Sequence, residues 1–168
     1  PPTEPPRASA PSPSVHVASR ADDLDREIAT LDVALTTPGH SLARQVQLAA
    51  DLSNRLADRF LMRGDRADLD RAIALAEGAV ASDAADPFPG VVARTNLAGL
   101  LGERFRLDAD PSDLDRAINL QREAIDAVDD AHAVRPILLG NLTASLDLRH
   151  VSRGDPTDLD EAIMTSEA

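Results

Sequence analysis

The chain has 168 residues, a formal net charge of −12 and no cysteine. The absence of cysteine excludes disulfides, thiolate metal sites and cysteine nucleophiles. An acidic chain repels phosphate backbones and anionic lipid, so we expect neither a nucleic-acid partner nor a membrane partner. Hydrophobic residues make up 43% of the sequence but aromatic residues only 2%. A core of aliphatic side chains suits closely packed helices better than a β-sandwich.

The N-terminal segment differs in composition from the rest of the chain. Six of the first 14 residues are proline. Because proline lacks an N–H group and disrupts helices, we expect residues 1–18 to be non-helical and polyproline-II-like. We therefore divide the chain into a Pro-rich linker, residues 1–20, and a helical repeat domain, residues 21–168. Composition favours a linker over a Pro-rich ligand for a partner, which is the alternative.

A four-residue signature, Asp-Leu-Asp followed by Arg or Glu, recurs every 45 residues. Its four copies begin at Asp23, Asp68, Asp113 and Asp158. An unbroken period of this length is typical of a repeat array. Apolar residues spaced by three and four follow each signature, which predicts a short amphipathic helix in each repeat. We place these helices near 21–36, 66–82, 111–128 and 156–168.

The starts of the short helices are well specified. An aspartate stands three residues before the signature in three repeats, where its side chain can cap the helix. These residues are Asp65, Asp110 and Asp155. Pro111 and Pro156 follow at the first helical position, where a missing N–H costs nothing. The first signature aspartate then lies at the third helical position, and we assign it mainly to stabilising the helix start.

Longer helices are predicted between the short ones, near 41–63, 87–107 and 132–153, with Pro136 marking a start or a kink. Gly64 and Gly154 end two of these helices, and Ala109 takes the glycine's place in the third. The turn to the next short helix is very tight, so each long and short helix should pack as an antiparallel hairpin. The sequence therefore predicts about seven helices.

The repeat resembles a known family. Ala and Ile within the signature helix, with a second Ala seven residues on (Ala72 and Ala79, Ala117 and Ala124), resemble the second helix of a tetratricopeptide repeat. Asn96-Leu97 and Asn141-Leu142 resemble its first helix. The usual unit has about 34 residues, so this unit is longer. The resemblance implies an all-α fold, an α-solenoid of antiparallel helix hairpins.

The string from Gly154 to Ile163 is also similar to long-period repeats of actinobacterial and fungal multidomain proteins. Those proteins often carry a caspase-like (CHAT) peptidase domain or a signalling ATPase elsewhere in the chain. The resemblance implies that this chain is a CHAT-associated module of a larger bacterial protein, for which we expect a cytoplasmic location.

The sequence contains no constellation that indicates catalysis or metal binding. No two of its four histidines are three or four residues apart, and the Asp-x-Asp strings lack the spacing of a calcium loop. We therefore expect no enzyme activity, no metal and no cofactor. Arg59, Arg104 and Arg149 recur at the 45-residue period. We expect them to pair with the second signature aspartates, such as Asp70, Asp115 and Asp160, rather than with an acidic ligand.

In tetratricopeptide arrays the first helices line a groove, and the resemblance implies a peptide-binding surface on the long helices. An asparagine amide can donate to and accept from a peptide backbone. The candidate groove residues are Asp51, Asn54, Thr95, Asn96 and Asn141. The alternative is that these asparagines bond between helices or face water.

Two functions follow from these observations. The first is a non-catalytic scaffold that binds a protein or peptide. The alternative is a regulatory or self-assembly segment that contacts its own chain or copies of itself and controls an attached effector domain, such as a caspase-like peptidase.

Overall fold

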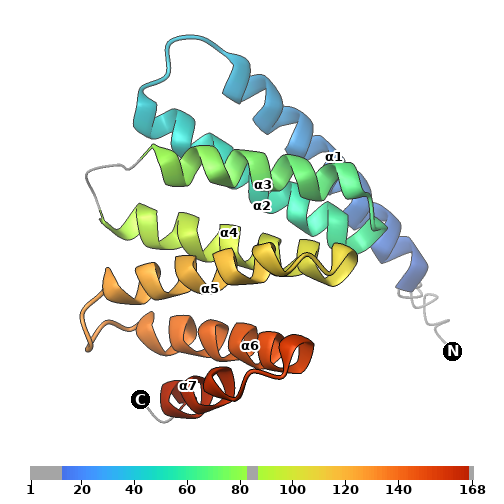
Figure 1. Cartoon of the computed structure of the whole chain (residues 1–168). Helices are drawn as coiled ribbons and strands as arrows, with labels where there is room; N and C mark the ends of the chain where they lie inside the picture. Colours follow the sequence, from blue (N-terminus) through green and yellow to red (C-terminus); the bar gives the residue numbers. More distant parts are fainter. Residues whose placement is uncertain (1–12, 83–86, 167–168) are drawn as a thin grey trace, which may run out of the picture.

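The computed structural model describes residues 13–82 and 87–166, and the protein has an all-α helical-repeat fold within them. Seven helices and no strand occur in these two ranges. The helices are α1 (Pro13–Thr36), α2 (Leu42–Arg63), α3 (Arg66–Ala81), α4 (Pro87–Asp108), α5 (Pro111–Asp126), α6 (Arg135–Arg153) and α7 (Pro156–Ser166). They stack in chain order from α1 at one end to α7 at the other (Figure 1).

Long and short helices alternate as the period predicts. The three hairpins are α2–α3, α4–α5 and α6–α7, and α1 adds a helix before the first of them. Each hairpin also packs on the next, because α3 contacts α4 and α5 contacts α6. In Figure 1 the chain reverses at each tight turn, so the paired helices are antiparallel. The short helices α3 and α5 therefore lie between two long helices.

The predicted helix starts are confirmed. Asp65 accepts a hydrogen bond from the Ala67 N–H at 3.0 Å, and Asp110 accepts one from the Ser112 N–H at 2.9 Å. Asp155 accepts from the Thr157 N–H in the same way. These bonds satisfy donors that the first turn of a helix leaves unpaired.

The long helices all end in the same way. Gly64 and Gly154 have φ values of 70° and 72°, and each donates its N–H to the carbonyl four residues earlier. Ala109 takes the same left-handed conformation, with a φ of 54°, and donates to the Phe105 carbonyl. The hairpin turn therefore imposes its backbone geometry even where the sequence supplies no glycine.

The core is built from leucine, isoleucine and alanine. Two leucines of each long helix, four residues apart, are almost fully buried. They are Leu52 and Leu56, Leu97 and Leu101, and Leu142 and Leu146. Leu69, Ala72 and Ile73 of α3 fill the same layer as the first leucine pair. The spacing of four places these side chains on one helix face, as the periodicity predicts.

Two predicted helix starts differ from the structure by more than two residues. Helix α1 begins at Pro13, so the expectation that residues 1–18 contain no helix is wrong for residues 13–18. Proline is tolerated in the first helical turn, and no proline occurs between Pro13 and the end of this helix. The other part of the expected linker, residues 1–12, lies outside the described residues. Helix α6 begins at Arg135 rather than 132, with Pro136 in its first turn.

Candidate functional site

Every hairpin contains a buried ion pair across its tight turn. An arginine near the end of the long helix donates two hydrogen bonds to the first signature aspartate, nine residues later. The pairs are Arg59–Asp68, Arg104–Asp113 and Arg149–Asp158, with Nε–Oδ2 distances of 2.7, 2.8 and 2.9 Å. The three aspartates are at most 5% exposed. Two-pronged binding of this kind is the strongest geometry for an arginine and a carboxylate.

These pairs correct the expected roles of the signature. The sequence assigns the first aspartate mainly to the helix start and the second to pairing with the periodic arginines. Instead the first aspartate binds the arginine of its own hairpin. At the third position of a helix the side chain points back toward the helix start, where the long helix ends. Its carboxylate therefore meets the guanidinium.

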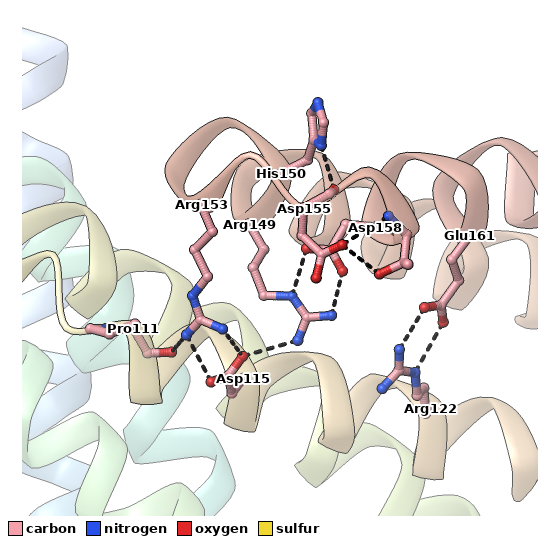
Figure 2. Close-up of polar contacts among 10 residues, drawn as sticks. Pro111, Asp115, Arg122, Arg149, His150, Arg153, Asp155, Asp158 and Glu161 are labelled. Carbon is pink, nitrogen blue, oxygen red and sulfur yellow. Dashed lines mark hydrogen bonds and ion pairs between the residues drawn. The ribbon is translucent and has the colours of Figure 1, made fainter.

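The second aspartate joins a short helix to the next long helix (Figure 2). Asp115 of α5 accepts hydrogen bonds from Arg149 at 3.0 Å and from Arg153 at 2.8 Å, both on α6. These bonds, that from Arg153 first, lower the pKa of Asp115 below its ordinary value. Asp25 of α1 makes the equivalent bonds with Arg59 and Arg63 of α2. The expected pairing is thus found at Asp115 with Arg149, while Asp70 and Asp160 pair with none of the periodic arginines among the described residues.

The middle interface replaces this contact by an arginine that bridges two aspartates. Asp108 occupies the position that Arg63 and Arg153 hold in the other long helices. Arg66 of α3 donates to Asp108 at 2.7 Å and also to Asp70 at 2.9 Å. This hydrogen bond lowers the pKa of Asp108. Where Asp108 replaces an arginine, Arg66 therefore supplies the positive charge between α3 and α4.

A charge exchange explains why one signature ends in glutamate. Residues 39 apart form ion pairs between successive signature-bearing helices, α1, α3, α5 and α7. They are Arg71–Asp32, Arg116–Glu77 and Glu161–Arg122. In the last pair the acidic and basic partners have changed places (Figure 2). The glutamate at the end of the fourth signature, Glu161, therefore has a basic partner, Arg122 of α5. Opposite charges at this spacing are visible in the sequence, but their meaning depends on knowing that the short helices are neighbours.

Three adjoining hollows follow the long helices, with volumes of about 690, 290 and 220 Å³. The first lies between α1 and α2, the second between α2 and α4, and the third among α4, α5 and α6. Asn54 lines both the first and the second hollow, and Thr95 and Gly99 line both the second and the third. Because each hollow shares a wall with the next, we treat them together as one long-helix groove.

The structure brings all five predicted site residues into this groove. Asp51 and Asn54 line the first hollow, Thr95 and Asn96 the second, and Asn141 the third. Asn96 donates to the Asn54 side chain at 3.0 Å, so these two amides are in part bonded between helices. The Asn141 side chain makes no hydrogen bond with any described residue.

The arginines of the groove are already paired with carboxylates. Arg55 binds Glu27 at 3.1 Å and Arg106 binds Glu103 at 2.8 Å. Arg26 pairs with Asp23 on the same helix. A ligand with a free carboxylate or phosphate would therefore have to break an ion pair to gain a cation. The groove instead offers neutral amide groups and the open space beside Gly99, where an added Cβ would meet nothing within 4 Å.

Gln121 is a groove residue that the sequence did not single out. It lines the third hollow from α5 and is only 6% exposed. Its Oε1 atom is buried and accepts no hydrogen bond within the described structure. The position belongs to the apolar stripe, where the two preceding repeats have Leu31 and Ala76, so a glutamine breaks the apolar pattern. A polar residue in an apolar stripe is the sequence signal that could have identified Gln121.

The described residues offer no metal site and no membrane-spanning helix. Residues 13–82 and 87–166 contain no cluster of three or more acidic or histidine side chains that could hold a metal ion. None of the helices found there is long and apolar enough to cross a membrane. The groove is thus the feature of the described structure in which hollows and unpaired amides coincide.

Comparison with known proteins adds no assignment. No protein-family model, no curated protein and no solved structure matches the chain.

Proposed function

We propose that the chain is a non-catalytic, tetratricopeptide-like scaffold that binds an extended peptide segment of a partner protein in the long-helix groove. It would act as a module of a larger bacterial multidomain protein. The observation that carries this proposal is the third hollow, where the Asn141 amide makes no hydrogen bond with a described residue and Gln121 adds a second amide. A peptide main chain that donates to and accepts from the Asn141 amide gains hydrogen bonds there.

The groove favours a peptide main chain over a charged group. Peptide N–H and C=O groups match the acceptors and donors of Gln121 and Asn141. The arginines along the groove are paired with carboxylates, which leaves little attraction for an anionic ligand. The glycine at position 99 widens the groove where the second and third hollows meet, so the peptide can lie close to α4.

Selection from a random peptide library displayed on phage tests the proposal. We expect enriched peptides to bind the wild-type chain. The Asn141→Ala substitution should lower their affinity at least about tenfold, which corresponds to about 1.4 kcal/mol. Gly99→Leu should also abolish binding because its side chain fills the groove. Failure to enrich any peptide, or equal binding to Gly99→Leu, would contradict the proposal.

Gly78→Leu is the matched control. Gly78 is an exposed helical glycine on α3 that lines none of the three hollows, and an added Cβ there also meets nothing within 4 Å. Both substitutions replace a poor helix former by a good one, so neither should lower the melting temperature. Loss of peptide binding in Gly99→Leu but not in Gly78→Leu would then report on the groove rather than on folding.

A further inference from the structure

One wall of the long-helix groove is a row of side chains on α6. Successive members of the row are four and then three residues apart, which places them on one face of the helix. They are Ile137, Asn141, Ala144, Leu148 and Val151. The three central members line the third hollow, so the row faces the groove. Because all but the asparagine are apolar, we call this row the α6 stripe.

Packing of further repeats leaves positions of this row open. Ile137 is 62% exposed and Val151 is 81% exposed. In α4, which has a hairpin on either side, the residue equivalent to Ile137 is Val92, and it is still 41% exposed. In α2, which two hairpins follow, the residue equivalent to Val151 is Leu61, and it is 67% exposed. The exposure of the α6 stripe is therefore a property of its place in the repeat.

The equivalent rows on the other two long helices carry charge. On α2 the row contains Asp51 and Asp58, and on α4 it contains Glu103 and Arg106. The α6 stripe contains no charged side chain. Burial against a charged group costs free energy, whereas burial of apolar surface against apolar surface is favourable. Apolar side chains of a ligand therefore bind best against α6.

The groove has an unpaired carboxylate but no unpaired arginine among the described residues that line its hollows. The charged residues that line the first hollow are Asp23, Arg26, Glu27, Asp51 and Arg55. The two arginines bind the first two carboxylates, which leaves Asp51 without a cation. Its side chain accepts a hydrogen bond from the Gln47 Nε2 at 2.9 Å.

The α6 wall also carries negative rather than positive charge. Asp147, beside Leu148, is exposed and pairs with no described cation. Unpaired carboxylates attract positively charged side chains and repel negatively charged ones. The groove therefore combines an apolar wall with an excess of negative charge.

We propose that the groove ligand is a cationic peptide segment with apolar anchor residues. Its apolar side chains pack on the α6 stripe, and a lysine or arginine binds Asp51. This inference rests on the function proposed above and names the class of peptide that the groove takes. An acidic segment would meet Asp51 and Asp147 as like charges. A segment without apolar residues would leave the α6 stripe in water.

Selection from a phage-displayed random library tests the class of peptide. Phage that bind the wild-type chain are kept, and those that also bind Gly99→Leu are removed. The two proteins have the same net charge, so this step discards peptides attracted only by the overall charge of −12. We expect the remaining peptides to contain more Lys and Arg than Asp and Glu, together with aliphatic or aromatic residues.

Asp51→Asn tests the charge contact. It places in α2 the residue that the other two repeats carry there, Asn96 and Asn141, so the fold should tolerate it. The affinity of the selected peptides, measured by fluorescence anisotropy, should fall about three- to fivefold and should depend less on salt than that of the wild type. Asp126→Asn is the matched control, because Asp126 is exposed on α5 and lines none of the three hollows.

The double substitution Ile137→Ser and Val151→Ser tests the apolar contact. Serine has about the same helix propensity as these two residues, so the fold should persist. The affinity should fall about tenfold because apolar side chains of the peptide lose their partners. Val33→Ser is the matched control, because Val33 is 67% exposed on α1 and lines none of the three hollows.

Two results separate this inference from the proposed function. Selected peptides that are acidic or lack apolar residues, or that bind either test variant as tightly as the wild type, would overturn the inference and leave peptide binding in the groove intact. Failure to select any peptide that Gly99→Leu excludes would overturn both.

Discussion

At the scale of single residues, the repeat imposes a conformation that one of its residues does not favour. Ala109 lies in the left-handed region with a φ of 54°, where the equivalent Gly64 and Gly154 carry no Cβ atom. A Cβ in this region approaches the following carbonyl oxygen, at a cost of about 1–2 kcal/mol. The turn keeps its shape because the Ala109 N–H still bonds to Phe105 and because Asp110 caps α5 immediately afterwards.

Ala109→Gly should therefore stabilise the protein. We expect the free energy of unfolding to rise by up to about 1 kcal/mol, since relief of strain exceeds the added chain entropy of glycine. Urea unfolding followed by circular dichroism measures this change. Gly64→Ala at the equivalent turn should change stability by a similar amount in the opposite direction. Equal stability of Ala109→Gly and the wild type would show that the turn carries no strain.

At the scale of the helices, the ion pairs fall into two classes. The pairs within a hairpin are buried, as at Asp113, which is 4% exposed and bound to Arg104 of the preceding helix. The pairs between successive short helices are exposed, as at Arg116 and Glu77. Burial strips water from the charges, so each partner of a buried pair depends on the other, whereas solvent screens an exposed pair.

Asp113→Asn should destabilise the protein far more than Arg116→Gln. The first leaves the partly buried guanidinium of Arg104 without its counter-charge, which costs about 3 kcal/mol. The second removes an exposed pair, which costs less than about 1 kcal/mol. The midpoints and slopes of urea unfolding curves distinguish the two. Similar losses would mean that the hairpin pair contributes no more than a surface contact.

At the scale of the whole molecule, acidic residues hold the repeats together. The pKa values of Asp25, Asp108 and Asp115 are lowered from 3.8 by hydrogen bonds from Arg63, Arg66 and Arg153. Each of these carboxylates contacts a neighbouring helix, so the hairpins are linked by charges as well as by the leucine core. Their protonation should therefore loosen contacts along the array.

Acid should lower the stability of the array through these groups. A carboxylate whose pKa is lower when folded than when unfolded stabilises fully above the unfolded value and loses this contribution as the pH falls through the folded value. We expect the free energy of unfolding to fall as the pH drops below about 4. Urea titrations from neutral to acidic pH measure this.

Asp115→Asn is the informative variant for that experiment. Protonation also relieves repulsion in a chain of net charge −12, which acts in the opposite direction. This second effect is nearly the same in the variant, so the difference between the two pH curves isolates the ion pair. The variant should be less stable at neutral pH and should lose less stability in acid. Parallel curves would contradict a role for Asp115.

The sequence by itself determined the period, the register and nearly all helix boundaries. These features depend on short-range causes: the spacing of apolar residues, the caps at Asp65 and Asp110, and the glycines at Gly64 and Gly154. The start of α1 is the main exception, since proline content suggested a linker where the backbone of residues 13–18 is helical. Asp51, Asn96 and Asn141 could be chosen in advance because equivalent positions of a repeat share a face, and Asn54 and Thr95 because they lie within one turn of them.

Only the tertiary structure decided which charges meet. Asp68 binds Arg59 across a turn, and Asp115 binds Arg149 of the next hairpin, although both aspartates belong to the same signature. The buried Oε1 of Gln121 likewise follows from what packs against α5. A sequence lists side chains in order, but pairing and burial depend on the relative position of helices that are tens of residues apart.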